Sequence, residues 1–388
     1  MTALHELRQK DWASWVPAVV VLLAVALFPI FRPPLDGFVD DCILALAYVV
    51  MALGLNIVVG FAGLLDLGYV AFYAFGALAA GWFASDHFTG LGGDKGVHIG
   101  VSDFVSGLPG LHFNFLLILI GAIVICAIAG AIIGLPTLRL RGDYIAIVTL
   151  AFGEIIGRFA QNGDAVTISG YAFSNGRQSI SPIDQINFPL VGEFDSATNI
   201  RSYYWVVLAL VLVVLFVNLR LRDSRIGRAW IALREDEVAA ASMGVPLVRT
   251  KLMAYAVGAA FGGISGAFLG TFLNSVNANL FQFGFSIFIL AMVILGGLGS
   301  IPGVVIGAVA LSFVNSYLIP DVLDQGFVGE FVKDIGLDFS FQQVSFGVFG
   351  FILVLMMVLR PEGLLPERRR KIELTEGVAG EDIYEARA

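Results

Sequence analysis

The sequence has no Asp, Glu, Lys or Arg between Lys251 and Asp321. About 20 apolar residues span the ~30 Å core of a bilayer, so residues 252–320 are long enough for three transmembrane helices. Breaks between them are visible at 274–279 and at the Gly-rich run 296–303. The second break could be a tight turn or a broken helix that lines a cavity, because irregular backbone at membrane depth must be shielded from lipid.

The same rule divides the rest of the chain. Hydrophobic residues make up 58% of the sequence and charged residues 14%, and the mean hydropathy is +0.86, all outside the range of soluble domains. We therefore predict an all-α, polytopic helical bundle with about ten transmembrane helices. The predicted spans are 12–31, 42–65, 67–85, 113–135, 144–159, 203–219, three within 252–320, and 344–359.

Basic residues are unevenly divided between the two sides of this predicted bundle. With ten spans, both termini and the segment 220–251 fall on one side, together with most of the 23 lysines and arginines. The positive-inside rule makes that side cytoplasmic. The net charge of -8 says less, because acids and bases are segregated by side. We predict a transmembrane domain over residues 1–371 and a flexible cytoplasmic tail over 372–388.

The hydrophilic segment 220–251 carries helix signals between two apolar runs. Asp223 or Ser224 can cap a helix start, and Gly244 followed by Pro246 indicates a stop. Three apolar residues recur at helical spacing, namely Ile226, Trp230 and Leu233. A basic loop can serve only as a topology determinant. A topology determinant does not require an ordered, capped helix. We therefore interpret the segment as an element that binds a soluble partner.

Four glycines lie four residues apart in the first helix predicted after this segment, at Gly258, Gly262, Gly266 and Gly270. Such a ridge of small residues lets another helix approach closely. Plain helix packing is the more common reason for this pattern, and a gate is the alternative.

Two ionisable residues fall inside one predicted span. Glu154 and Arg158 lie four residues apart, on the same face of a helix. An intramembrane carboxylate is costly, so Glu154 could be a pathway or gating group. A local pair with Arg158 near the outer interface, which neutralises both charges, is the interpretation we favour.

The sequence lacks the motifs of the common hydrolytic and nucleotide-binding sites. It has no phosphate-binding loop, no G-x-S-x-G, no H-E-x-x-H and no dinucleotide fingerprint. Cys42 and Cys126 sit in apolar runs, and His87, His98 and His112 match no metal motif, so we expect packing cysteines and surface histidines. We predict a non-catalytic chain with no metal site and no nucleic-acid partner.

Five sequence blocks resemble the permease subunits of bacterial branched-chain amino acid ABC importers. LRLRGDY and REDE-x-AA make the chain similar to the M-type permease rather than its shorter H-type partner. The blocks are GLNIVVGFAGLLDLGYVAFYAFGA (54–77), LRLRGDYIAIVTLAFGEI (138–155), IGRAWIALREDEVAAASMGV (226–245), AMVILGGLGSIPGVVIGA (291–308) and RPEGLLP (360–366).

The resemblance implies an inner-membrane permease with the architecture of the vitamin-B12 and ribose importers (type II). It also implies a homologous second permease, two ATPase subunits that bind ATP and Mg²⁺, and a periplasmic binding protein. The coupling contact to the ATPase would be carried by Arg234, Glu235, Asp236, Glu237, Ala239, Ala240 and Gly244. The translocation pathway would include Asn56, Tyr69, Phe72, Tyr73 and Glu154, with helix packing as the alternative for the first four.

Two stretches depart from the family pattern. A TGGPNG-like run is replaced by TISGYAFSNGRQSI at 167–180, and an S-P-E-S-F-like motif by NANLF at 277–281. Both lie on the predicted outer side and bear on the identity of the substrate. The main expectation is leucine, isoleucine and valine, with urea or short amides as the alternative. A channel or secondary carrier that needs no ATPase is the alternative from another class.

Overall fold

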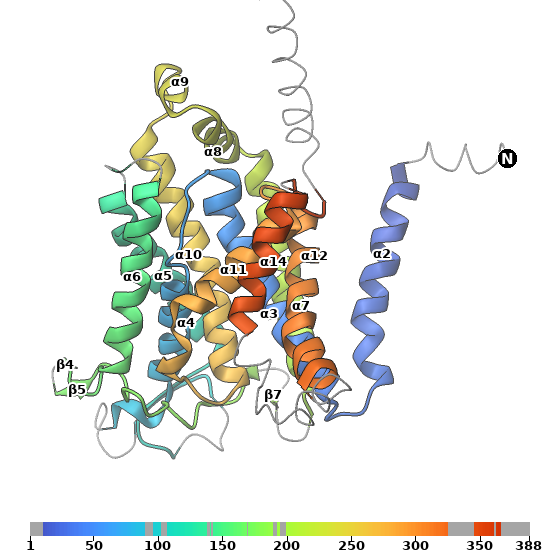
Figure 1. The fold of residues 1–388 in the computed structure, drawn as a ribbon. Coiled ribbons are helices and arrows are strands. Elements are labelled where there is room, and N and C mark those ends of the chain that lie inside the picture. The colour runs from blue at the N-terminus through green and yellow to red at the C-terminus, as the bar shows by residue number, and fades with distance from the viewer. Residues whose placement is uncertain are drawn as a thin grey trace, which may run out of the picture.

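The computed structural model describes residues 11–365, apart from 90–95, 102–106, 138–139, 141–142, 169, 189–191, 195–198, 325–344 and 361. The described part is mostly helical, as predicted (Figure 1). The predicted tail 372–388 lies outside the described residues. The α-helices are α2 (Asp11–Leu27), α3 (Gly37–Leu55), α4 (Val70–Phe83), α5 (Phe115–Thr137), α6 (Asp143–Gln161), α7 (Arg201–Asp223), α8 (Arg225–Glu235), α9 (Glu237–Ser242), α10 (Leu247–Phe272), α11 (Phe283–Gly296), α12 (Ile301–Phe313) and α14 (Ser345–Leu359).

Six helices in the described part are long and apolar enough to cross a membrane. Two of them are extended by π-helices, α3 by η2 (Asn56–Phe61) and α12 by η5 (Val314–Asp324). The six are Gly37–Phe61, Phe115–Thr137, Tyr144–Gln161, Arg201–Asp223, Leu247–Phe272 and Ile301–Pro320. The shorter apolar helices are Val19–Phe31, Val70–Phe83, Phe283–Gly296 and Phe349–Leu359. Each predicted span therefore corresponds to an apolar helix, although four of these helices are short.

Helix α10 lies in the centre of the bundle and packs against α3, α4 and α5. A Cβ atom on Gly266 would collide with the carbonyl oxygen of Tyr73 in α4, and one on Gly262 would lie 3.0 Å from Cβ of Phe72. On the side of α3, the hydroxyl of Ser265 donates a hydrogen bond of 2.8 Å to the carbonyl oxygen of Ala47. The glycine ridge therefore packs helices closely together, which confirms the packing interpretation.

Helix α4 begins later than the sequence predicted, because residues 62–69 are not helical. The backbone N–H of Leu67 donates to the hydroxyl of Thr149 in α6, at 3.0 Å, and that of Val70 to the hydroxyl of Ser286 in α11, at 2.9 Å. A backbone donor that is buried without a helical partner needs such a substitute. Side chains from α6 and α11 thus supply the hydrogen bonds that a helix would have made within itself.

The Gly-rich break at 296–303 is a tight turn between α11 and α12. Gly297 and Gly299 have φ values of +114° and +83°, a region that favours glycine. The hydroxyl of Ser300 accepts a hydrogen bond from the N–H of Gly303, at 3.2 Å, and caps the start of α12. Of the two possibilities for this break, the structure has the turn.

Short strands gather at the end of the bundle opposite α8 and α9 (Figure 1). In the first group β1 pairs antiparallel and β2 parallel with β3, and β4–β5 and β6–β7 form two antiparallel pairs. His112 in β3 is only 1% exposed, and its Nδ1 lies 2.7 Å from a carboxylate oxygen of Asp184. The expectation of a surface histidine was wrong for His112, because a loop distant in sequence covers it. The strands are β1 (Ala84–Ser85), β2 (Val97–Ile99), β3 (Leu111–Phe113), β4 (Thr167–Ile168), β5 (Tyr171–Ala172), β6 (Asn187–Phe188) and β7 (Gly192–Glu193).

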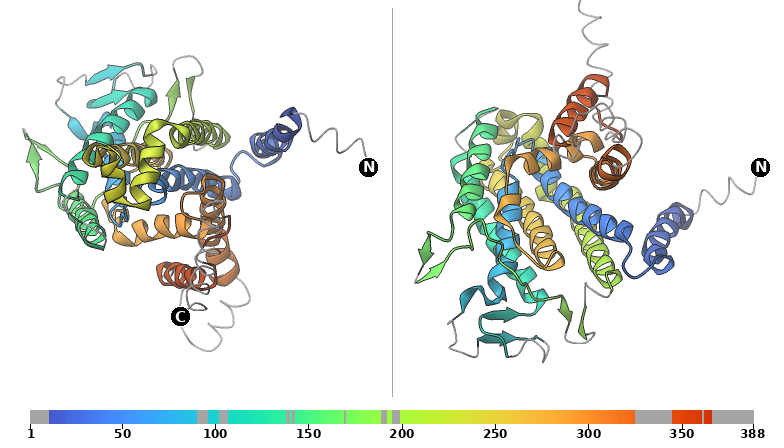
Figure 2. Two further views of the ribbon diagram at one scale, coloured as in Figure 1. Left: turned by 90° about the horizontal axis from the view of Figure 1, so that it is seen from above. Right: turned by 60° about the horizontal axis from the view of Figure 1, so that its bottom comes forward.

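Helix α2 stands apart from the bundle for most of its length (Figures 1 and 2). Its last turns are held by α7, where the hydroxyl of Tyr204 donates to the carbonyl oxygen of Val25 at 2.9 Å. The indole N–H of Trp205 donates to the carbonyl oxygen of Ala26 at 3.1 Å. The first helix is thus attached to the bundle at one end.

Candidate coupling surface and translocation residues

The hydrophilic segment after α7 folds into two short helices, α8 and α9, at one end of the molecule (Figure 1). The hydroxyl of Ser224 caps α8 by accepting from the N–H of Gly227 at 3.1 Å, whereas Asp223 is the last residue of α7. Trp230 is fully buried, and its indole N–H donates to the carbonyl oxygen of Thr250 at 2.9 Å. Gly244 follows α9 with φ +85°, so the predicted stop is confirmed.

Four of the seven residues assigned to coupling have a structural role within this chain. The guanidinium of Arg234 donates to the carbonyl oxygen of Gly60, and the carboxylate of Glu237 lies 2.7 Å from Nζ of Lys251, whose side chain is 4% exposed. Asp236 caps α9 by accepting from two backbone N–H groups, and Ala240 is buried. Arg234 and Glu237 thus tie the two helices to the rest of the chain, whereas Asp236 caps α9 from within the element.

The other three residues, Glu235, Ala239 and Gly244, are exposed. Beside them Val238 is 67% exposed and Met243 85% exposed, and sequence reasoning had singled out neither. Large apolar side chains that stay exposed next to small residues are typical of surfaces that pack against another protein. We call these five residues the coupling surface. Val238 and Met243 could have been identified from the sequence, because each is a large apolar residue in a stretch of small and charged residues that forms no apolar face.

Arg234 connects this element to the interior of the bundle. Its acceptor, the carbonyl of Gly60, belongs to the π-helix η2, and π-helical turns often occur at functional sites. In the same helix the side-chain oxygen of Asn56 accepts a hydrogen bond of 2.9 Å from the N–H of Gly299, in the α11–α12 turn. A Cβ atom on Gly60 would lie 2.7 Å from that same N, so the two backbones are in close contact.

The segment after α14 closes over the same turn. The N–H groups of Leu364 and Leu365 donate to the carbonyl oxygens of Leu295 and Gly296, at 2.8 and 3.1 Å. Gly363 has φ +83°, and a Cβ atom there would lie 2.5 Å from Cα of Gly297. Residues 363–365 of the RPEGLLP motif therefore contribute to the fold by fixing the end of α11.

The four aromatic and polar candidates for the pathway are buried in the core. Asn56 and Tyr69 are fully buried, and Phe72 and Tyr73 are 1% and 5% exposed. The hydroxyl of Tyr69 donates to the carbonyl oxygen of Gly258 at 2.8 Å, and its ring meets that of Phe72 edge to face. None of the four lines the cavities described below, and their role in a pathway stays a prediction.

Glu154 lies on α6 beside Arg158, as the spacing predicted. The two charged groups approach to 3.9 Å, and Nη1 of Arg158 lies 3.4 Å from the side-chain oxygen of Gln161. A cleft of about 270 Å³ opens between this face of α6 and the start of α11. Of the five pathway candidates, Glu154 alone borders a described cavity.

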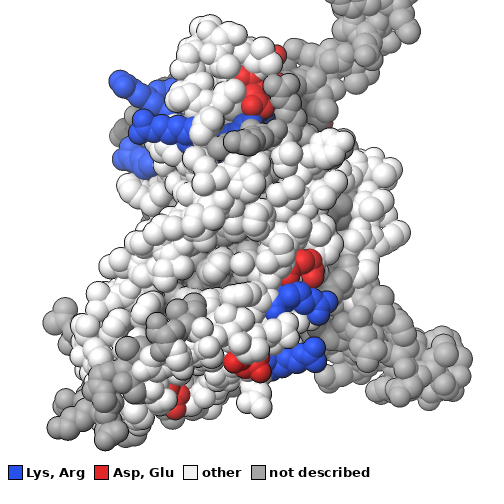
Figure 3. Space-filling model, turned by 90° about the vertical axis from the view of Figure 1, so that its left-hand side faces the viewer, with Lys and Arg blue, Asp and Glu red and all other residues white. Residues whose placement is uncertain are grey.

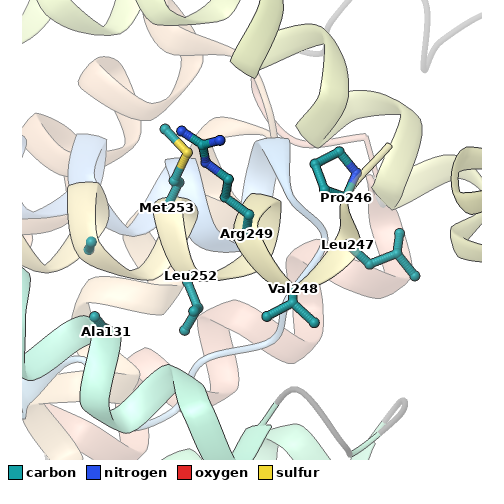
Figure 4. A pocket seen from close by; sticks show the side chains of 8 residues that line it. Ala131, Pro246, Leu247, Val248, Arg249, Leu252 and Met253 are labelled. Carbon is teal, nitrogen blue, oxygen red and sulfur yellow. The ribbon is translucent and has the colours of Figure 1, made fainter. Parts of the chain in front are cut away.

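A larger groove, of about 620 Å³, lies between α5 and the start of α10 (Figure 4). Val248 and Leu252 point from α10 toward Ala131 of α5, whereas Arg249 and Met253 point away from it (Figure 4). Apart from Arg249, the lining residues are apolar, which suits a surface in contact with lipid or another helix. It offers no set of polar groups for a small solute.

The sequence matches a family model described as the permease component of the branched-chain amino acid transport system, over residues 39–359. It is 36% identical to the high-affinity branched-chain amino acid transport system permease protein LivM of Salmonella typhimurium, over 94% of this chain and 79% of that protein. LivM of Escherichia coli is also 36% identical, over 93% of this chain and 77% of that protein. The Escherichia coli permease protein LivH is 31% identical over 44% of this chain and 48% of its own length. No solved structure matches the chain.

Proposed function

The chain belongs to the permease components of branched-chain amino acid transport systems, and on this premise we propose that it is the M-type permease subunit of an ABC importer. Its substrates are leucine, isoleucine and valine, which it carries across the bacterial inner membrane. The observation that carries the proposal is the 36% identity to LivM over 94% of the chain. The exposed α8–α9 element supports it, because such an element can receive a soluble ATPase.

The proposed arrangement has ten spans, in which the four short apolar helices cross the membrane together with non-helical segments. Helix α4 has 14 residues. A helix of that length measures ~21 Å, which is less than a bilayer core of ~30 Å. The segment 62–69, in which most residues are buried, completes this crossing. Ten spans resemble the type II importers and place both termini and the α8–α9 element in the cytoplasm, in accordance with the distribution of basic residues.

The proposed partners follow from what this chain lacks and from its relatives. A partial match to LivH supports a homologous second permease beside this one. The chain has no phosphate-binding loop, so two separate ATPase subunits would bind ATP and Mg²⁺. A periplasmic binding protein would deliver the amino acid to the end that carries the short strands.

In the proposed mechanism each ATPase docks on the coupling surface. Closure of the ATPases on ATP moves α8 and α9, and the contacts of Arg234 and Glu237 pass that movement to the membrane part. The cavity between the two permeases then changes from outward to inward access. Alternating access of this kind requires two states of one packed structure.

The test is uptake of labelled leucine by proteoliposomes that contain the complete complex. ATP is enclosed in the vesicle lumen, and loaded binding protein is added outside. Met243→Asp places a charge on the coupling surface, and Arg225→Asp, another exposed cytoplasmic site, is its control. We expect Met243→Asp to reduce uptake at least about tenfold and to weaken ATPase retention, because an interfacial charge without a partner costs several kcal/mol. The control should retain uptake.

Three results would revise the proposal. Uptake without ATPases would replace the importer by an autonomous carrier. Uptake of urea or short amides in place of leucine would leave the mechanism and change the substrate. Full uptake and full ATPase retention in Met243→Asp would remove the coupling surface from the ATPase contact.

A further inference from the structure

Helix α6 carries a polar stripe along its outer half. Glu154, Arg158 and Gln161 follow one another at intervals of four and three residues, so they share one face of a membrane-crossing helix. Ionisable side chains in a membrane span face a partner or a water-filled cavity rather than lipid. Figure 3 views the side where α6 lies and shows a band without charged side chains above a group of adjoining acidic and basic side chains.

The stripe borders a cleft rather than a flat surface. The cleft, of about 270 Å³, is lined on one side by α6 and on the other by residues 281–284 at the start of α11. A Cβ atom on Gly157 would collide with the carbonyl oxygen of Phe281, so the two walls of the cleft are in close contact there. No side chain caps the N-terminus of α11. The N–H of Phe285 bonds to the carbonyl oxygen of Gln282, and the other first-turn N–H groups of α11 add to the polar character of this wall.

The two charges on the stripe are incompletely matched to each other. The closest distance between the guanidinium of Arg158 and the carboxylate of Glu154 is 3.9 Å, and the side chains are 71% and 43% exposed. By contrast, Nζ of Lys251 and the carboxylate of Glu237 lie at 2.7 Å. A charged hydrogen bond of full strength is about 2.7–2.9 Å long. Both charged groups can therefore still form strong hydrogen bonds to a zwitterionic ligand, which carries an anion and a cation together.

An apolar groove adjoins the same pair of charges. It measures about 390 Å³ and shares Glu154 and Arg158 with the polar cleft. Its other walls include Ile155, Phe159 and Val166. One pair of opposite charges is therefore flanked by a polar cleft and by an apolar surface, which matches the parts of an aliphatic amino acid.

We propose that Glu154 and Arg158 form a transit subsite for the amino acid after its release from the binding protein. The carboxylate of Glu154 accepts hydrogen bonds from the α-ammonium group, and the guanidinium of Arg158 binds the α-carboxylate. The aliphatic side chain lies against Ile155 and Phe159. This inference rests on the proposed function and adds to it the point at which this chain recognises the substrate.

A swap of the two charges separates this subsite from a structural ion pair. Glu154→Arg combined with Arg158→Glu restores an ion pair at the same spacing, so a purely structural pair would regain uptake. An L-amino acid held at three points, by its ammonium, carboxylate and side chain, does not fit when two of the three are exchanged. We expect uptake of L-leucine to remain at least about tenfold below the parent in Glu154→Gln, in Arg158→Gln and in the swap, since each removes a charge-assisted contact.

The measurement is the rate of ATP-dependent L-leucine uptake at several concentrations of loaded binding protein, with assembly of the complex checked by purification. Arg32→Gln is a matched control, because Arg32 also belongs to an i, i+4 pair, with Asp36, at 3.5 Å. Its uptake should stay within about twofold of the parent, because the Arg32 side chain is 46% exposed and loss of such a surface cation costs little.

Recovery of uptake in the swap, or full uptake in both single variants, would overturn the subsite. Loss of assembly in the near-isosteric Glu154→Gln would assign the pair to the fold and would also overturn it. If the parent complex transports no branched-chain amino acid, the proposed function itself is rejected. That result is distinct from failure of the subsite, because it is obtained before any variant is compared.

Discussion

The guanidinium group of Arg234 donates a hydrogen bond to the main-chain carbonyl oxygen of Gly60, although 174 residues separate the two in the sequence. Arg234 lies at the end of α8, and Gly60 lies in the π-helix that ends the first long span of the bundle. The side chain also covers Gly63, where a Cβ atom would lie 2.5 Å from Cγ of Arg234. One side chain therefore links the α8–α9 element to the core of the bundle.

Replacement of this link should uncouple ATP hydrolysis from transport. In Arg234→Gln we expect fewer leucine molecules imported per ATP hydrolysed, because the movement of α8 is no longer passed to η2. Arg234→Lys should recover only part of the ratio, since a lysine lacks the planar guanidinium. The ratio is measured by parallel uptake and phosphate-release assays, with Arg225→Gln as the control. An unchanged ratio in Arg234→Gln would contradict this role.

The pair between Lys251 and Glu237 should contribute strongly to stability. Lys251 is almost completely buried, so Glu237→Ala leaves a buried ammonium group without its partner. We expect a loss of about 3–5 kcal/mol in the free energy of unfolding. Lys251→Met together with Glu237→Ala should recover part of it, because no buried charge remains. Thermal unfolding of the purified complex provides the comparison, and equal losses in the single and double variants would argue against a buried unpaired charge.

The contact between His112 and Asp184 should make the strand-bearing end of the bundle sensitive to pH. Burial lowers the pKa of the His112 imidazole, but the hydrogen bond and the charge of Asp184 outweigh it, so the pKa is raised above its usual 6.5. A raised folded-state pKa stabilises the protein fully below pH 6.5, and the contribution is lost as pH rises through the higher value. Amide exchange in β1 and β3 should therefore accelerate over that range. The variant His112→Phe should lack this pH dependence.

Gly266 and Gly350 allow a matched test of the glycine ridge. A Cβ atom on Gly266 would collide with the backbone of α4, whereas one on Gly350 in α14 would meet nothing within 4 Å. We expect Gly266→Ala to reduce the yield of folded complex severely and Gly350→Ala to leave it unchanged, because alanine favours helix where space allows. Yields after detergent extraction decide the matter. Equal yields would mean that α4 and α10 can move apart at no cost.

Much of the fold could be predicted from the sequence, because charge-free length and glycine spacing are local signals. Ser224 and Gly244 occupy the helix start and stop that their chemistry predicted. The inward turn of Arg234 could not be predicted, since its acceptor is a backbone carbonyl far away in the sequence. The same reason applies to Asn56, whose partner Gly299 lies 243 residues further on. Val238 and Met243 were missed because exposure depends on what the fold leaves uncovered.

The start of α4 is held by hydroxyl groups from two other helices, Thr149 of α6 and Ser286 of α11. A segment with a helical ladder of its own moves as one rigid rod. Residues 67–70 instead take their position from two separate supports, so the chain leading into α4 is tied to both α6 and α11. Three elements that are distant in the sequence are thus joined at one point, and the polar stripe of α6 lies on one of them.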